Sequence, residues 1–423
     1  MFSLKIQKCT KCKMQKKWRL FNATDFQSLM YPCFIFCRIF AIFPYKFNAS
    51  IFEVSKAYYI LSTMVVCICC ACNLVFIYGL AISETITYGD VTRNLEVICY
   101  FILNSVIIII THILSIPRMR LLQTILEISS KLSSESYQKL SRFIHVKDIL
   151  GTILFIVQNN IFCFTNMPYK YEQDWRTTLL FIFATYISLL EFHTNMLYAN
   201  CACILKACFK NINNNLLHMQ QLIINDAKSY VSMSSCHMQR NQFLLIKLKT
   251  LKKQHLTISK TVQTLNIIFS LQLLATIAIV FTNTTFRLYS YIARWQHELL
   301  LIRFDWHILE AFFIYMAHFV IKLMLLVWIC ETCKNQFQET GTIIHDILNN
   351  TKDEQIKYEL RLFSLQILHC ENTFTAKGLT VDATLLTAMV GSITTYMLIL
   401  IQFLITSHSC DGNSTINNTH IRN

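Results

Sequence analysis

Seven long apolar stretches run through this chain, and the basic residues between them fall almost entirely on alternate connections. Each stretch is long enough to cross a hydrocarbon core about 30 Å thick. The predicted spans are residues 57–82, 97–116, 149–166, 178–205, 263–286, 308–330 and 379–406. One set of connections holds 30 Lys and Arg residues and the other set holds 7. Because cytoplasmic loops retain positive charge, the rich set is predicted to lie inside the cell.

This assignment places the amino-terminal segment in the cytosol and the carboxyl-terminal tail outside. The basic connections are residues 1–56, 117–148, 206–262 and 331–378. We therefore predict an all-α polytopic membrane protein with a cytoplasmic segment over 1–56, a seven-helix domain over 57–406 and a short extracellular tail over 407–423. A G-protein-coupled receptor has the opposite orientation, so the charge distribution argues against that class.

The composition excludes several other classes. A chain of 423 residues that is 54% hydrophobic and only 15% charged is too apolar for an ordinary soluble globule. Its net charge of +14 lies beside the spans, which favours contact with anionic inner-leaflet lipid over nucleic-acid binding. The pairs Cys9–Cys12 and Cys330–Cys333 lack a second ligand pair at zinc spacing, so no metal or other cofactor is expected.

The cytoplasmic segments are predicted to contain helices of their own. We interpret the apolar segment Tyr31–Tyr45 as a short helix at the inner interface, with Arg38 reaching the headgroups. Residues 206–262 have apolar positions at helical spacing on both sides of a break, which predicts two helices that continue the fourth and fifth spans. The next inner connection has one apolar stripe of Ile356, Leu360, Phe363 and Ile367. Such a stripe needs a partner, so we expect a packed helical layer on the inner side.

The last predicted span carries a short motif. Thr395-Tyr396 is followed by five apolar residues and then by Gln402-Phe403, and Gly378-Leu-Thr-Val-Asp precedes the motif in what we expect to be the same helix. This motif resembles the signature of insect gustatory receptors, members of the seven-transmembrane insect chemoreceptor superfamily. Near the other end, Tyr31-Pro32 and Phe43-Pro44-Tyr45 resemble the opening segment of that family, although Ala41 stands where a Gly is usual. The middle of the chain resembles the family in span number, orientation and loop lengths.

The resemblance implies a ligand-gated cation channel of four subunits around a pore lined by the last helix of each. It also implies that the inner helical layer holds the subunits together, and that Gln402 and the aliphatic turn before it form the constriction. Thr395, Leu398, Ile399 and Gln402 fall at i, i+3, i+4 and i+7 and share one helix face. A ring of aliphatic residues beside a ring of neutral amides is a workable gate. In the alternative, Gln402 hydrogen-bonds a neighbouring helix within one subunit.

By the same resemblance, a ligand pocket lies in the outer half among the middle spans. Aromatic walls and amide groups there suit a small polar or semi-polar tastant. The candidate residues are Tyr100, Asn159, Asn160, Phe162, Phe183, Tyr186, Phe281 and Asn283. For each of them, packing in the core is the alternative. In the tail, Asn413 and Asn417 stand in sequons and are candidates for glycosylation.

Two ionisable residues stand deep in the spans, where charge is costly and functional by default. Glu191 in the fourth span and Lys322 in the sixth lie at similar depth, about 20 Å below the outer end at helical rise. They are therefore able to form an ion pair. General membrane chemistry favours the alternative, in which Lys322 extends toward the inner surface and Glu191 bonds a hydroxyl group or stays protonated.

Taken together, the sequence predicts a gustatory receptor in the plasma membrane of gustatory sensory neurons, opened by a small-molecule tastant. The resemblance implies a homo- or hetero-tetramer with other gustatory receptor subunits, and an odorant receptor of the same superfamily is the main alternative. A transporter needs helices broken by Gly or Pro, and the chain has only 7 Gly and 4 Pro. An enzyme is not expected, because no His cluster, Gly-flanked Ser nucleophile or paired intramembrane acids occur. Sugars, bitter compounds, amino acids and carbon dioxide all remain candidate tastants.

Overall fold

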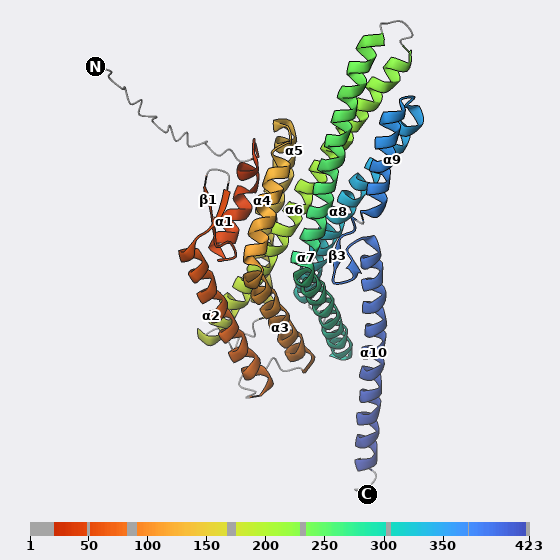
Figure 1. Cartoon of the computed structure of the whole chain (residues 1–423). Helices are drawn as coiled ribbons and strands as arrows, with labels where there is room; N and C mark the ends of the chain where they lie inside the picture. Colours follow the sequence, from red (N-terminus) through yellow and green to blue (C-terminus); the bar gives the residue numbers. More distant parts are fainter. Residues whose placement is uncertain are drawn as a thin grey trace, which may run out of the picture.

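The computed structural model describes residues 21–48, 51–82, 91–166, 175–228, 234–301, 306–370 and 372–419. Within these ranges the chain forms ten α-helices and two small hairpins (Figure 1). The helices are α1 (Phe26–Ile39), α2 (Lys56–Ala81), α3 (Val91–Ile113), α4 (Ser115–Ser129), α5 (Ser134–Asn166), α6 (Trp175–Lys228), α7 (Ser234–Leu301), α8 (Trp306–Asn350), α9 (Glu354–His369) and α10 (Ala383–Thr419). The strands are β1 (Tyr45–Asn48), β2 (Ile51–Val54), β3 (Thr375–Ala376) and β4 (Leu379–Thr380), and each consecutive pair is antiparallel.

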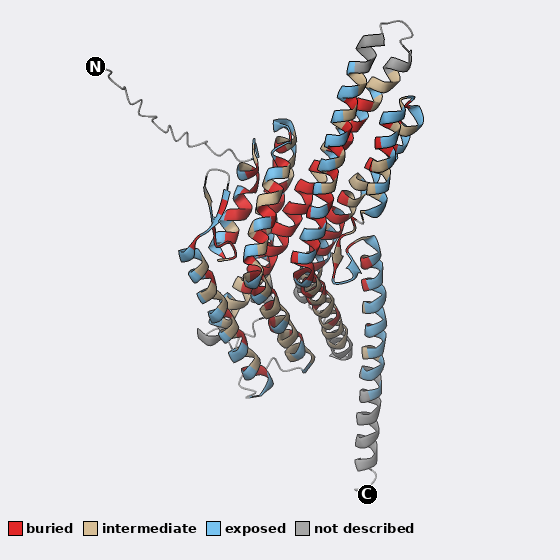
Figure 2. Cartoon of the chain, in the orientation of Figure 1, coloured by how far each residue is buried: buried red, intermediate tan, exposed pale blue. Residues whose placement is uncertain are grey.

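Helices α6, α7 and α8 run through the middle of the bundle. Figure 1 shows α2 and α3 on one side of them and α10 on the other. Most of the buried residues lie on the central helices, whereas α10 is exposed along much of its length (Figure 2). With 54 and 68 residues, α6 and α7 are far longer than a bilayer requires. The prediction that helices continue the fourth and fifth spans is therefore confirmed, while residues 229–233 between them lie outside the described ranges.

Six of the described helices are long and apolar enough to cross a membrane, namely α2, α3, α6, α7, α8 and α10. The remaining predicted span, residues 149–166, belongs to α5, which begins earlier, at Ser134. Charged Lys147 and Asp148 and the amide of Gln158 lower the hydropathy of this helix, and all three are buried. Helix α5 packs against α6 and α8, so these polar groups are sheltered by protein.

The amino-terminal helix lies against the bundle. Helix α1 begins after Asp25, whose carboxylate accepts a hydrogen bond from the backbone of Ser28 at 2.9 Å, a capping box. Its apolar residues Leu29 and Met30 are fully buried, and it packs against α5 and α6. The predicted helix over Tyr31–Tyr45 is thus shifted toward the amino end, because the β1–β2 hairpin begins at Tyr45.

The predicted inner layer is present, and α9 belongs to it. Asp353 caps this helix by accepting hydrogen bonds from the backbones of Gln355 and Ile356. The predicted apolar stripe is confirmed, with Ile356, Leu360 and Phe363 buried and Ile367 half-buried. Its partners are α7 and α8, beside which α9 lies in Figure 1.

His255 of α7 stands at the centre of this layer, before the predicted span of residues 263–286. Three aromatic rings surround it: Phe209 of α6, Phe337 of α8 and Phe363 of α9, with ring centroids 5.3 to 5.5 Å from its own. Burial lowers the pKa of His255 to about 4, because the cage cannot solvate an imidazolium. The folded chain therefore holds this histidine in its neutral form.

This cage predicts that acid weakens the inner layer. The pKa of His255 is lower in the folded than in the unfolded chain, where it is about 6.5, so the stabilisation is complete above pH 6.5 and falls as the pH drops. At pH 5 we expect a loss of about 2 kcal/mol. Thermal unfolding of the purified protein between pH 7.5 and 5 measures it. His255→Leu should remove this part of the pH dependence, and an unchanged slope in the variant would contradict the assignment.

Candidate pore helix and buried charge network

The predicted pore residues stand on an open face of α10. Thr395, Leu398, Ile399 and Gln402 are all exposed in this single chain. The opposite face attaches the helix to the bundle through Leu385, Met389 and Met397, which are buried. Helix α10 contacts α7 and α8 by this face, and the four predicted pore residues stay exposed among the described residues. Such a face is available to other copies of the helix.

The remaining motif residues divide between two environments. Tyr396 packs edge to face against Phe281 of α7, with ring centroids 5.8 Å apart. Phe403 is 70% exposed. The alternative in which Gln402 bonds a neighbouring helix of the same subunit has no support here, because Gln402 is exposed.

The start of α10 differs from the prediction. The span was expected from residue 379, but residues 375–380 form the β3–β4 hairpin and the helix begins at Ala383. Gly378 sits in the hairpin turn with φ of +95°, a conformation that favours glycine and that a helix excludes. Asp382 then caps the helix, since its carboxylate accepts from the backbone of Thr384 at 3.1 Å. Lys334 of α8 lies 3.8 Å from the same carboxylate.

Helix α7 holds the connection between α9 and α10. The amide of Asn266 donates a 2.6 Å hydrogen bond to the backbone oxygen of Thr373. Asn372 donates from its side chain to the hydroxyl of Ser259 at 2.9 Å. Helix α10 is thus held on α7 through the connection before it as well as through the ring contact of Phe281.

The predicted ligand residues do not gather in one place. Tyr100 of α3 faces α6, where its hydroxyl bonds that of Ser188. Phe183 also faces α3 and stacks on Phe101. Tyr186, by contrast, donates to the backbone oxygen of Phe40 beyond α1 at 3.2 Å.

The other ligand candidates lie on two helices, α5 and α7. On α5, Asn159 is half-buried and Asn160 bonds its own helix at the backbone oxygen of Ile156. On α7, Phe281 faces α10, and Asn283 is 1% exposed with an amide nitrogen that has no hydrogen-bond partner among the described residues. The side chains of Phe162, Asn413 and Asn417 lie outside the described part of the structure.

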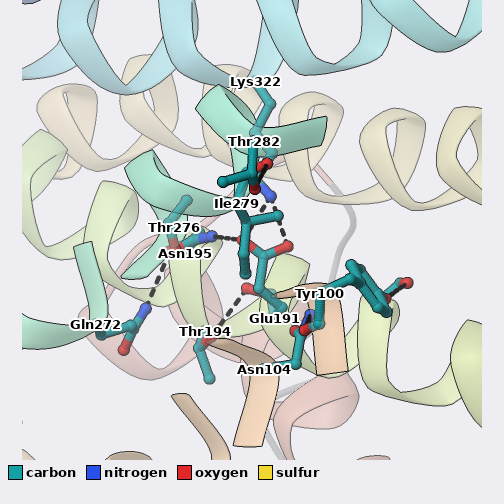
Figure 3. A network of polar contacts seen from close by, with 11 residues as sticks. Tyr100, Asn104, Glu191, Thr194, Asn195, Gln272, Thr276, Ile279, Thr282 and Lys322 are labelled. Atoms are coloured by element: carbon teal, nitrogen blue, oxygen red, sulfur yellow. Dashed lines mark hydrogen bonds and ion pairs between the residues drawn. The ribbon is translucent and has the colours of Figure 1, made fainter. Parts of the chain in front are cut away.

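Glu191 on α6 and Lys322 on α8 form an ion pair inside the bundle (Figure 3). The Nζ atom of Lys322 lies 2.5 Å from both carboxylate oxygens of Glu191. Both residues are buried, so neither reaches solvent or lipid headgroups. The alternative favoured by sequence alone, with Lys322 extended toward the inner surface, is therefore wrong. The two buried charges compensate each other, so the loss of either partner would leave the other as an unpaired buried charge.

A line of hydrogen bonds connects this pair with α7, as Figure 3 shows, and beyond α7 with α4. The amide of Asn195 donates to Glu191 at 2.7 Å. Gln272 and Thr276 of α7 donate to the amide oxygen of Asn195 at 3.0 and 3.2 Å. Arg118 of α4 donates in turn to the amide oxygen of Gln272 at 2.7 Å. One buried polar chain thus joins α4, α6, α7 and α8.

Most residues of this hydrogen-bonded network are not among the site residues that the sequence predicts. Asn195 and Gln272 were not among the predicted site residues, although both are amides within predicted spans, and amides at membrane depth usually bond a neighbouring helix. Arg118 lies two residues after the second predicted span, where the sequence indicates only a basic residue of a connection. Its guanidinium also lies 4.5 Å from the ring centroid of Phe269, which stabilises the cation within the protein.

Two further ion pairs fix the helices around the network. Glu96 of α3 and Arg287 of α7 approach to 2.6 Å. Within α5, Lys147 and Asp148 approach to 2.5 Å, and Asn200 of α6 donates to the second carboxylate oxygen at 2.8 Å. Each of these carboxylates is buried beside a cation, so the described bundle balances its buried acidic charge locally.

Comparison of the sequence with known families and proteins gives a family match over most of the chain and matches to two relatives over shorter segments. Residues 30–407 match the sequence model of a family described as 7tm chemosensory receptor. Gustatory receptor 28b of Drosophila melanogaster is 32% identical over 156 residues, which are 35% of this chain and 32% of that protein. Gustatory receptor 28a of the same organism is 35% identical over 116 residues, 26% of each chain. The aligned part thus spans a third or less of these curated relatives.

Solved structures with a similar fold include an insect olfactory receptor. The structure of olfactory receptor OR5 from Machilis hrabei superposes with a TM-score of 0.64, covering 89% of this chain and 98% of that one at 12% identity. The same receptor in complex with eugenol gives a TM-score of 0.59 at 13% identity, over 89% and 97% of the two chains. At these identities the likeness concerns the fold, which extends over nearly the whole of both chains.

Proposed function

Because this chain belongs to the 7tm chemosensory receptor family, we propose that it is a gustatory receptor that works as a ligand-gated, non-selective cation channel. The family and the apolar helices make it a multi-pass membrane protein. The relatives named gustatory receptors favour taste as the modality, with the plasma membrane of gustatory sensory neurons as its site.

The observation that carries the channel proposal is the open face of α10. A membrane helix packed within one chain hides its polar groups, yet Thr395 and Gln402 of α10 are exposed beside Leu398 and Ile399. Four copies around an axis bring these faces together and bury them around an ion path. In such an assembly the rings formed by Leu398 and Ile399 exclude water in the closed state. When these aliphatic rings widen, the amides of Gln402 line the ion path.

The ligand in this proposal is a small, semi-polar molecule. Olfactory receptor OR5 was solved with eugenol, which supports a small-molecule ligand for a receptor of this fold. In this chain, buried Asn283 of α7 has an amide nitrogen without a hydrogen-bond partner among the described residues. A ligand with an apolar body and one hydrogen-bond acceptor matches this donor.

Expression of the full chain in cells with low background current tests the proposal. We expect a tastant from a panel of sugars, bitter compounds and amino acids to evoke a cation current that reverses near 0 mV. The same cells test the orientation, because an epitope before Met1 should be labelled only after permeabilisation. A tastant response that is blocked by G-protein inhibitors and carries no current would contradict the channel.

An odorant receptor is the second candidate, supported by the fold shared with OR5. The sequence favours taste, since the identities of 32% and 35% are to gustatory receptors and the identity to OR5 is 12%. The tastant panel extended with volatile odorants separates the two functions, because an odorant receptor should respond to the volatile compounds alone.

A further inference from the structure

A hollow lies between α4, α6 and α7 on the predicted cytoplasmic side. Its volume is about 210 Å³, and Lys131, Asn211, Lys253 and Gln254 are among its polar lining residues. The apolar lining includes Ile212 and Ile258, and neither acidic nor aromatic side chains line it. All of the lining residues come from the basic connections 117–148 and 206–262. This pocket is therefore separate from the buried charge network and from the pore helix.

The two lysines of the pocket have no acidic partner in the part of the chain that the structure describes. Among the described residues, neither Lys131 nor Lys253 forms an ion pair. The neighbouring lysines of α7 differ, because Lys249 and Lys252 lie 3.5 and 2.6 Å from the carboxylate of Glu359 on α9. On the side that faces α9, the lysines of α7 are paired with Glu359. On the side that faces the pocket, Lys253 has no acidic partner among the described residues. Two cations without an acid favour an anionic occupant.

The other lining groups narrow the chemistry of that anion. The side-chain amides of Asn211 and Gln254 can each donate and accept, as hydroxyl groups of a polyol require. Ile212 and Ile258 suit the apolar face of a small ring, whereas a nucleobase would lack an aromatic partner. The volume is several times the roughly 30 Å³ of a water molecule and below the roughly 300–1,000 Å³ of most ligand sites. It therefore fits a headgroup and not a whole lipid.

We propose that this pocket binds a phosphorylated polyol, the group that a phosphoinositide headgroup and a free inositol phosphate both present. Lys131 and Lys253 bind the phosphates, and the amides of Asn211 and Gln254 bind the hydroxyl groups. Basic pockets at the cytoplasmic side of membrane helices commonly take such groups. The binding goes beyond the proposed channel function and does not depend on it.

The test uses the purified full chain in nanodiscs of neutral lipid. One arm titrates inositol 1,4,5-trisphosphate, and the other adds phosphatidylinositol 4,5-bisphosphate to the disc and detects it by native mass spectrometry. Lys131→Gln with Lys253→Gln should weaken binding at least about tenfold, because two charged hydrogen-bond donors are lost. Binding of the soluble probe identifies the free phosphate as a ligand, and binding of the lipid alone identifies the membrane as the source.

Matched variants distinguish binding in the pocket from general electrostatic attraction to the basic surface. Lys139→Gln with Lys260→Gln removes the same charge from exposed positions outside the pocket and should bind like the unmodified chain. Gln254→Leu keeps the charge and should weaken binding about threefold to tenfold through the lost amide. Equal weakening in both double variants, or no binding of either probe to the unmodified chain, would overturn the proposal. None of these readouts requires a tastant or a current.

Discussion

Replacing Lys322 with Met is expected to destabilise the folded chain by about 3–5 kcal/mol. The substitution leaves the carboxylate of Glu191 buried between α6 and α8 without its cation, at a position that water does not reach. Glu191→Gln strands the ammonium group of Lys322 in the same way and should cost a similar amount. Fluorescence-detected size exclusion after heating gives the unfolding midpoint, and surface labelling gives the fraction that leaves the endoplasmic reticulum.

Double variants of Glu191 and Lys322 distinguish the contribution of the ion pair to stability from that of the other contacts of each residue. Glu191→Gln combined with Lys322→Met leaves no buried charge and should recover most of the loss, as should the exchange Glu191→Lys with Lys322→Glu. Lys334→Met is the matched control, because Lys334 is partly exposed and lies 3.8 Å from Asp382, so it should cost less than about 1 kcal/mol. Double variants as unstable as the single ones would argue that the two side chains act independently.

Gln402→Arg is expected to reduce the tastant-evoked cation current at least about 100-fold at equal surface expression. In a tetramer this change places four guanidinium groups in one ring of the proposed pore, and they repel cations at close range. The exposed side of α10 tolerates the larger side chain within one subunit, so folding should be retained. Whole-cell current at saturating tastant, divided by the labelled surface protein, measures the effect.

The opposite charge at the same position provides the control. Gln402→Glu has nearly the same size and should retain current while raising the permeability to divalent cations. Gln402→Asn keeps the neutral amide and should conduct like the unmodified chain. If Gln402→Arg and Gln402→Glu reduce the current equally, the effect comes from disturbed packing and α10 does not line the ion path.

The sequence predicted the helices well because their apolar stretches are long. The extended helices α6 and α7 and the buried stripe of α9 followed from periodicity, which does not depend on distant contacts. The start of α10 was wrong because Gly378 and the preceding Lys377 adopt positive φ in a hairpin turn. A run of mostly apolar residues does not reveal such a turn, since Gly378 alone is compatible with either conformation.

The side-chain contacts were harder to predict than the helices. Depth in the membrane placed Glu191 and Lys322 at one level, but which way each side chain faces depends on helix rotation and on neighbours far away in the sequence. Helix rotation is also unknown for the ligand candidates, and they face different helices. Tyr186 faces the end of α1, whereas Phe281 faces α10. The sequence predicts only a connection where α4 lies, because the basic residues of this helix mask its buried apolar face.

Two of the contacts that α7 makes with α10 and with the connection before it restrict how α10 is able to move. One lies at Asn266 and the other at Phe281, about 22 Å apart along α7 at helical rise. Sliding along α7 would break both contacts at once, whereas a swing about the Asn266 contact would preserve that contact and loosen the ring contact near the middle of α10. The cheapest displacement is therefore a pivot, whose amplitude is greatest at the far tip, beyond Gln402. Such a hinge lets the C-terminal part of α10 move outward while its N-terminal end stays nearly fixed.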